Sequence, residues 1–178
     1  MQVNDGRTAA IVDPLSVPDI RPLGKLFADK GIVKVFHAGS QDIAILYHET
    51  GVMPSPVFDT QVAASLLGFP LQVGLGPLVR ALCDVRLAKA DSYTDWSRRP
   101  LTKNQIRYAI DDVRYLPQMY EQMCAKLNRS GRLEWLEDDF AELANPAKYD
   151  NEPREMWRHV KRISTLHRQQ LSVARELA

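Results

Sequence analysis

The amino-acid sequence predicts an α/β domain, and three local patterns support that prediction. Residues 32–36 (IVKVF) form a short apolar run typical of a strand, and residues 40–51 have the apolar spacing of a helix. A strand, a tight turn and a helix in this order make a βα unit, which is typical of α/β proteins. Residues 1–12 predict a β-hairpin, and residues 102–116 predict a capped amphipathic helix.

The hairpin is the first element in the chain. Residues 4–6 (Asn-Asp-Gly) supply the turn, and residues 8–12 are the expected return strand. The first arm consists only of residues 1–3, and a two-stranded ribbon with so short an arm is not stable alone. We therefore expect the printed sequence to begin inside a strand of a longer protein.

The remaining elements follow at short intervals, most of them with a clear start or stop. Ser40 is the expected N-cap of its helix and Gly51 the stop, and Asp59 is the expected N-cap of the next helix. Pro117 lies in the path of the helix at 102–116 and predicts a kink or a restart. The expected segments are a strand at 57–58 and helices at 19–29, 40–51, 59–68, 75–85 and 102–116, the last of which continues beyond the proline.

The predicted domain organisation follows a change in composition towards the C-terminus. Residues 132–152 are acidic and rich in turn residues, and residues 153–178 are basic with helical apolar spacing. We expect residues 1–150 to form one domain, and residues 151–178 to be a linker with the first helices of an all-α accessory region. Because the helical pattern continues to Ala178, the C-terminus is also expected to lie inside a longer protein.

Composition places the chain among ordinary globular proteins. Of its 178 residues, 45% are hydrophobic and 25% charged, and 23 basic against 22 acidic residues give a net charge of +1. Any nucleic-acid site must therefore be local. No apolar run approaches the ~20 residues that span a bilayer, and Cys83 and Cys124 fit neither a metal spacing nor a disulfide framework. We expect a cytoplasmic protein without a membrane partner.

The helix at 102–116 carries the clearest candidate site. Tyr108 and Asp112 are four residues apart and so share a face. At ~100° per residue, Asp112 lies at the margin of the apolar stripe, whereas Asp111 points to solvent. A carboxylate at a core margin requires a partner, which is a cation, a hydrogen-bond donor or a metal. A salt bridge and a metal site are both open interpretations of this helix alone.

Other candidate residues have structural interpretations beside the functional ones. Asp42 lies in the first turn of its helix, where the helix dipole favours a carboxylate without any function. His37 follows a strand, where a structural histidine is favoured over a ligand. Basic residues interleaved with aromatics hold phosphates and stack bases, but a solvated loop has the same composition. Such a stretch contains Lys89, Tyr93, Trp96, Arg98, Arg99, Lys103 and Arg107.

Four segments taken together resemble the ribonuclease D family, which belongs to the DEDD 3′-5′ exonucleases with a tyrosine in the third motif. The segments are HAGSQDIAIL, FDTQVAASLLG, KADSYTDWSRRPLT and QIRYAIDDVRYL, and the resemblance covers roughly residues 8–150. It implies an RNase H-like fold with a mixed sheet flanked by helices. It also implies two divalent ions, Mg²⁺ or Mn²⁺, held by four carboxylates, and no small-molecule cofactor. The implied substrate is RNA, such as tRNA precursors or other structured RNA 3′ ends.

The resemblance assigns roles to individual residues. Asp42 matches the aspartate of the second motif and Asp112 that of the third, so both are implied metal ligands. Tyr108 matches the tyrosine that orients the attacking water. The residues expected to contact nucleic acid are His37, Lys89, Trp96, Arg98 and Arg99. The first motif, Asp-x-Glu, would lie before the hairpin, ahead of the printed sequence, so we expect little activity from this chain alone. Residues 151–178 would lead into a helical, HRDC-like accessory domain.

Two alternative functions fit the same residues. The chain could be a non-catalytic nucleic-acid-binding or interaction module. It could also belong to a DNA-directed 3′-5′ exonuclease, because the metal ions contact only phosphate.

Overall fold

The computed structural model describes residues 1–88, 94–150, 167 and 170–173. The chain forms two compact units, residues 1–144 and residues 145–178. The elements of the first unit are β1 (Gln2–Asn4), β2 (Ala9–Ile11), η1 (Arg21–Leu23), α1 (Gly24–Ala28), β3 (Lys34–Phe36), α2 (Ser40–Thr50), β4 (Val57–Asp59), α3 (Thr60–Leu66), α4 (Leu75–Cys83), α5 (Lys103–Arg114), α6 (Leu116–Arg129), η2 (Leu133–Leu136) and α7 (Glu137–Leu143). In the second unit, η3 spans Pro146–Lys148, and most of the helices predicted over 153–178 lie outside the described residues.

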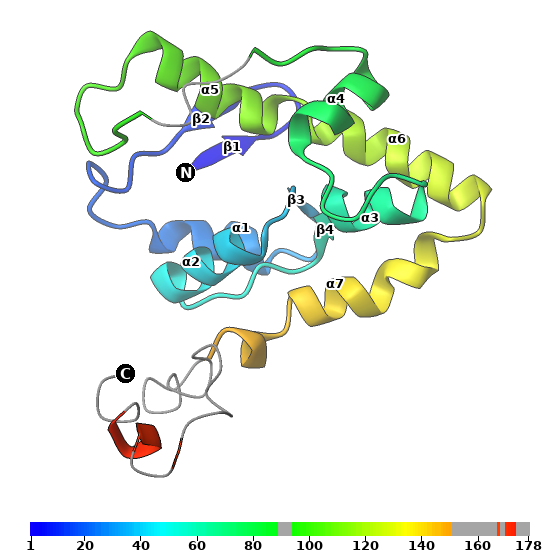
Figure 1. Ribbon diagram of the computed structural model, residues 1–178. Helices are drawn as coiled ribbons and strands as arrows, with labels where there is room; N and C mark the ends of the chain where they lie inside the picture. Colours follow the sequence, from blue (N-terminus) through cyan, green and yellow to red (C-terminus); the bar gives the residue numbers. More distant parts are fainter. Residues whose placement is uncertain (89–93, 151–166, 168–169, 174–178) are drawn as a thin grey trace. The chain divides into compact units, whose positions relative to one another are not determined.

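The strands pair in two short sheets within the described part of the chain. Strands β1 and β2 are antiparallel, with Val3 opposite Ala10. Strands β3 and β4 are parallel, with Val35 opposite Phe58. Because α2 connects β3 to β4, these elements form the βα unit that the sequence predicts (Figure 1). The α/β prediction is confirmed, and both pairing directions are present.

The hairpin turn is held by its own side chains and is tied to α5. Asn4 Oδ1 accepts a hydrogen bond from the Gly6 amide at 2.9 Å, and Gly6 has a φ of +87°, which glycine adopts without strain. The Asn4 amide nitrogen donates to the carbonyls of Val113 and Arg114 at 3.0 and 3.1 Å. It thereby satisfies two carbonyls at the end of α5. Helix α5 lies along β1 and β2 (Figure 1).

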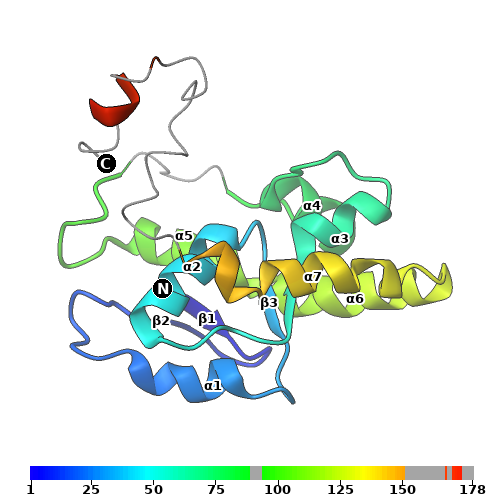
Figure 2. The same cartoon turned by 90° about the horizontal axis from the view of Figure 1, so that it is seen from below.

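The hydrophobic core of the first unit lies around α6. This helix starts after Tyr115, one residue before Pro117, which confirms the predicted restart. Its fully buried side chains are Met119, Met123 and Leu127, and α3 and α4 pack against it (Figure 2). No helix in the described residues is long and apolar enough to cross a membrane.

Residues 133–143 are helical, although the sequence predicted a turn-rich connection over 132–152. They form η2 and α7. Leu136 is 1% exposed, and the Phe140 ring lies 5.0 Å from that of Phe58. The acidic residues face solvent while the apolar ones pack against β4, so this acidic stretch is an amphipathic helix.

Candidate active site

A capping box fixes the start of α5, as the sequence predicts. Thr102 Oγ1 accepts from the Gln105 amide at 3.2 Å, and Gln105 Oε1 accepts from the Thr102 amide at 2.9 Å. The Gln105 side-chain nitrogen also donates to Thr94 Oγ1 and to the Asp95 carbonyl, both at 3.0 Å. Gln105 is 3% exposed, so these bonds are shielded from water. The loop that precedes α5 is therefore attached to the helix that carries the candidate residues.

Tyr108 lies beside Asp112 and against the ring of Trp96. The two ring centroids are 5.9 Å apart at an interplanar angle of 47°. The pKa of the Tyr108 hydroxyl is raised, first by the negative charge of Asp112 and then by burial. Tyr108 therefore remains a neutral phenol at neutral pH and can donate a hydrogen bond.

The half-buried Asp112 carboxyl has its pKa raised to about 6. The causes are burial, then the charge of Asp111, then the charge of Asp42. The sequence predicted that Asp111 would be solvated, and this is wrong. Its side chain is only 20% exposed and lies 3.7 Å from the Arg114 guanidinium. A pKa near 6 means that Asp112 is ionised at neutral pH but gains from any cation brought close to it.

Asp42 supplies the second carboxylate, from the first turn of α2. Its side chain keeps contact with solvent, yet the surrounding protein displaces enough water to raise its pKa. The charge of Asp59 raises this pKa further, and the Met1 ammonium lowers it. Asp42 and Asp112 come from different helices, α2 and α5, and the negative charge of Asp42 contributes to the raised pKa of Asp112.

The chemistry of the two carboxylates, Asp42 and Asp112, suits a divalent cation. Carboxylate oxygens are the donors that Mg²⁺ and Mn²⁺ prefer, and a cation would remove the repulsion between Asp42 and Asp112. Within residues 1–88, 94–150, 167 and 170–173, no group of three or more His, Cys, Asp or Glu side chains could hold a metal. The described residues therefore supply two interacting carboxylates, half of the four that the resemblance implies.

The turn before α2 leads into the helical turn that carries Asp42, and its backbone is tightly constrained. Ala38 has a φ of +55°, which is unusual for a residue with a side chain. Gly39 lies so close to Phe36 that an added Cβ would come within 2.4 Å of the Phe36 Cβ. The N-cap of α2 is Gly39 without a side-chain cap, so the prediction of a Ser40 cap was wrong by one residue.

Asp59 holds this turn from the neighbouring strand. Its carboxylate accepts from the amides of Ala38 at 3.1 Å and Gly39 at 2.7 Å. It also accepts from the first amides of α3, those of Gln61 at 2.8 Å and Val62 at 3.4 Å, which confirms the predicted N-cap. Asp59 is 2% exposed, so the four amides depend on it. The sequence did not predict that Asp59 also binds the amides of the turn before α2. This contact arises because β3 and β4 are parallel, so that the carboxyl ends of the two strands lie side by side.

Thr60 adds a further connection between β3 and β4. Its hydroxyl donates to the Phe36 carbonyl at 3.0 Å and lies 2.9 Å from Nδ1 of His37. The pKa of His37 is lowered by burial, against the opposing effects of Asp59 and of a hydrogen bond to the Val73 backbone. Because these contacts engage the imidazole within the fold, a nucleic-acid contact of His37 stays a prediction.

The basic loop contains one arginine whose guanidinium is occupied. Arg99 donates to the two carboxylate oxygens of Asp13 at 2.6 and 2.7 Å, and to the carbonyls of Trp96 at 2.7 Å and Arg98 at 2.9 Å. This fork attaches the loop to the end of the hairpin, and it holds the pKa of Asp13 well below its usual range. Arg98 is exposed, and Lys89 lies outside the described residues. Nucleic-acid contacts of all these residues stay predictions.

The structure therefore assembles part of the predicted set. Asp42, Asp112 and Tyr108 interact electrostatically, and Trp96 joins them through its contact with Tyr108.

The family profile and the sequence relatives that match this chain are of 3′-5′ exonucleases and ribonuclease D proteins. The profile of a family described as 3′-5′ exonuclease matches residues 1–128. A ribonuclease D from Sphingobium indicum is 46% identical over 163 residues, which cover 90% of this chain and 42% of that protein.

Solved structures agree with these relatives. The crystal structure of Escherichia coli RNase D, described as an exoribonuclease involved in structured RNA processing, superposes with a TM-score of 0.85 at 33% identity. That match covers 96% of this chain and 45% of the other. Brucella melitensis NrnC with bound Mg²⁺ gives a TM-score of 0.63 at 35% identity, covering 72% of this chain and 62% of that one. The structure of Brucella melitensis NrnC bound to pGG superposes with a TM-score of 0.74 at 33% identity. That match covers 84% of this chain and 74% of NrnC.

The chain spans less than half the length of these ribonuclease D proteins. Its fold is that of the RNase H-like exonuclease cores, as the resemblance implied. The profile match, the sequence relatives and the superposed structures together show that the chain belongs to the 3′-5′ exonuclease family, in its ribonuclease D group.

Proposed function

We propose that the protein to which this chain belongs is a metal-dependent 3′-5′ exoribonuclease that trims structured RNA 3′ ends, with tRNA precursors as the expected substrates. The observation that supports this most is the carboxylate pair, in which Asp42 from α2 and Asp112 from α5 repel each other beside Tyr108. Two relatives add support, because one NrnC structure contains Mg²⁺ and E. coli RNase D is described as acting on structured RNA.

Each residue has a distinct task in this proposal. Asp42 and Asp112 would hold Mg²⁺ or Mn²⁺, whose bound form supplies charge neutralisation and an activated water for phosphodiester hydrolysis. The neutral Tyr108 hydroxyl would orient that water through a hydrogen bond, and the Trp96 ring would restrict the rotation of the tyrosine ring. Trp96 and the exposed Arg98 would contact the last nucleotides of the RNA, one by stacking and one through phosphate.

The carboxylate pair supplies two of the four carboxylates that the resemblance implies. We therefore propose that the 178-residue chain, tested alone, binds Mn²⁺ weakly and cleaves RNA slowly. A cytoplasmic location agrees with an RNA substrate and with Cys83 and Cys124, which are free thiols.

Metal titration of two neighbouring variants tests the proposal. Asp112→Asn should weaken Mn²⁺ binding by about tenfold or more, because it removes a ligand, whereas Asp111→Asn should change it much less. Isothermal titration calorimetry at pH 7.5 measures both affinities. Equal losses in the two variants, or none in either, would contradict the assignment of Asp112 as a ligand.

A cleavage assay with 5′-labelled RNA and Mn²⁺ completes the test. The expected result is slow shortening from the 3′ end that disappears in Asp112→Ala. Fast cleavage that Asp112→Ala abolishes would support the metal site and contradict the low activity of the chain alone. RNA binding that does not respond to EDTA, without any cleavage, would favour a non-catalytic module, and an equal rate on DNA would broaden the substrate class.

A further inference from the structure

The outward face of α5 carries basic side chains that the candidate active site does not use. Lys103, Arg107 and Arg114 are spaced four and seven residues apart and are all exposed. At ~100° per residue they lie within about 40° of one another around the helix, and about 140–180° from Asp112. The helix therefore presents its carboxylate to one side and a basic stripe to the other.

Arg7 of the hairpin turn extends this stripe. A surface hollow of about 430 Å³ lies between the turn and α5, and it is lined by Asn4, Gly6, Arg7, Ala9, Ile110 and Arg114. The hydrogen bonds from the Asn4 side chain to the carbonyls of Val113 and Arg114 fix the turn to the helix. The backbone positions of Arg7 and Arg114 are thus held on opposite sides of a hollow large enough for a phosphate group.

The charge of this surface is not balanced by nearby acids. Arg7, Lys103 and Arg107 form no ion pair with any residue that the structure describes, and Arg114 has one weak contact, at 3.7 Å from Asp111. Asp5 is adjacent, but its carboxylate accepts from the turn amides of Arg7 and Thr8 at 2.8 and 2.7 Å. Four cations against these two acids leave a local excess of positive charge in a chain of net charge +1.

Such a surface has the chemistry of a phosphate-backbone contact. Guanidinium forks match phosphate oxygens, and unpaired cations on a fixed scaffold gain binding free energy by releasing counterions from a polyanion. Helix α5 has 12 residues and is therefore about 18 Å long, enough to follow several phosphates along an RNA strand.

We propose that the α5 basic face, formed by Lys103, Arg107, Arg114 and Arg7, binds the phosphate backbone of the folded body of an RNA whose 3′ end lies at the carboxylate pair. This inference rests on the proposed function, which places an RNA end beside Tyr108 and Asp112. A helix with its side chains is about 10–12 Å thick, so a very short oligonucleotide at the carboxylates does not reach the opposite face. The body of a folded RNA is large enough to reach the opposite face by extending around the N-terminal end of α5.

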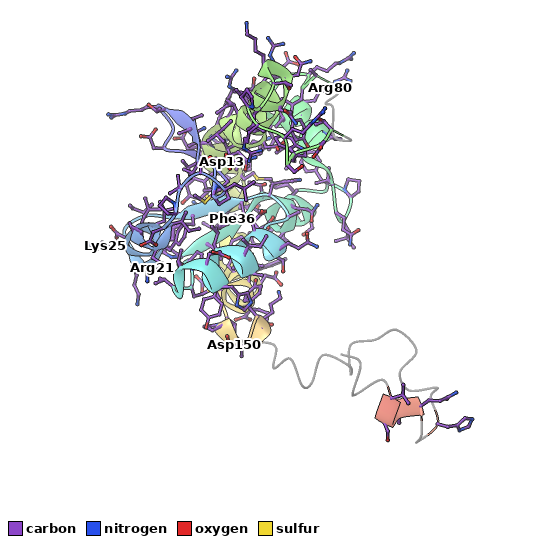
Figure 3. The ribbon with its side chains drawn as sticks, turned by 90° about the vertical axis from the view of Figure 1, so that its left-hand side faces the viewer. Asp13, Arg21, Lys25, Phe36, Arg80 and Asp150 are labelled. Atoms are coloured by element: carbon purple, nitrogen blue, oxygen red, sulfur yellow. The ribbon has the colours of Figure 1, made fainter. Side chains whose placement is uncertain are left out.

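The test compares two RNAs and two sets of variants of the 178-residue chain. Fluorescence anisotropy in EDTA measures binding of a hairpin RNA with a 3′ overhang and of a labelled dinucleotide, which is too short to reach around α5. The test variant is Arg7→Gln/Arg107→Gln/Arg114→Gln. The matched control, Lys25→Gln/Lys30→Gln/Lys126→Gln, removes the same charge from exposed residues elsewhere. Lys25 projects from α1, well away from α5 (Figure 3).

The test variant should bind the hairpin RNA at least tenfold more weakly than the wild type, with the dinucleotide affinity unchanged. The slope of its affinity against salt concentration, on logarithmic axes, should fall by about one for each phosphate that the variant no longer neutralises. The control variant should bind both RNAs within about twofold of the wild type. Hairpin binding that is unchanged in the test variant, or weakened equally in both variants, would overturn the proposal.

The outcome separates this inference from the proposed function. Mn²⁺ binding and 3′ shortening report on the carboxylate pair, and hairpin binding in EDTA reports on the α5 basic face. If shortening fails while the hairpin result holds, the proposed function is wrong and the RNA surface remains. If shortening occurs and the hairpin affinity does not change in the test variant, only the surface is wrong. Unchanged urea unfolding curves would show that both triple variants are folded.

Discussion

The two aspartates of the candidate site are positioned by different parts of the chain. Asp112 depends on neighbours in sequence, because the capping box of Thr102 and Gln105 sets the start of α5 and the helix sets the rest. Asp42 follows a turn that Asp59 holds from about 20 residues further along the chain. One half of the site is local in sequence, and the other half depends on tertiary contacts.

This difference has an energetic consequence. Losing a helix cap costs about 1 kcal/mol, because the exposed end of the helix regains water. Losing a buried acceptor costs more, because the orphaned amides have no water to replace it. The Asp42 half should therefore be more sensitive to single substitutions than the Asp112 half.

Asp59→Ala is expected to have the largest effect. It should lower the free energy of unfolding by about 3–5 kcal/mol, because four amides lose a buried, charged acceptor. Urea unfolding followed by circular dichroism measures the change. Asp95→Ala is the control, because this carboxylate accepts from Ser97 in an exposed loop and should matter far less. Similar losses in both variants would remove the distinction between the two halves of the site.

Gly39→Ala tests the same turn by crowding. A Cβ at 2.4 Å from the Phe36 Cβ forces the turn to move, and we expect a loss of about 2–3 kcal/mol. Gly76→Ala in α4 is the control, since its Cβ meets nothing within 4 Å and alanine favours a helix by up to about 1 kcal/mol. The melting temperature should fall for Gly39→Ala and stay the same or rise for Gly76→Ala. An unchanged melting temperature for Gly39→Ala would show that the turn is not tightly packed.

Asp112→Asn is expected to stabilise the metal-free chain at high pH. A folded-state pKa of about 6, against about 3.9 unfolded, means that the folded state binds more protons between these values. Stability therefore falls as pH rises from about 4 to about 6, by about 1–2 kcal/mol in a half-buried site. The asparagine variant lacks this loss, so its advantage should be full at pH 8 and absent near pH 4.

Urea unfolding in EDTA across this pH range measures the effect. Asp138→Asn, which replaces an exposed aspartate of α7, should stay within about 0.5 kcal/mol of the wild type throughout. An Asp112→Asn curve parallel to the wild type would contradict the raised pKa.

The sequence predicted the Asp112 half better than the Asp42 half for a physical reason. A capping box and helical period involve residues three or four apart, so the start of α5 and the shared face of Tyr108 and Asp112 could be predicted. The second role of Asp59 depends on the pairing of β3 with β4, which local patterns do not specify. The carboxylate cluster itself required the fold.

Two further residues have partners that were not predicted from the sequence. The guanidinium of Arg99, whose nucleic-acid contact stays a prediction, donates to Asp13, 86 residues away in sequence. Asp111 was predicted to be solvated because a helical wheel places it opposite the apolar stripe, whereas Arg114 and its surroundings leave it 20% exposed. The Asp13 partner of Arg99 is distant in sequence and could not be predicted from local spacing, whereas Arg114 is three residues from Asp111, a helical spacing that could have indicated the contact.

Thr102→Ala is expected to have the smallest effect among the variants that compare the Asp112 half of the site with the Asp42 half. It removes one bond of the capping box, the one from the Gln105 amide to Thr102 Oγ1, and we expect a loss of about 1 kcal/mol. Asn104→Ala, at an exposed position in the first turn of α5, should be neutral or slightly stabilising, because alanine has the higher helix propensity. Gln105 keeps its bonds to Thr94 and Asp95, so the loop stays attached and Mn²⁺ binding should be unchanged. If Thr102→Ala lowered the free energy of unfolding as much as Asp59→Ala, the start of α5 would have to depend on tertiary contacts as well, and the Asp112 half would no longer be local.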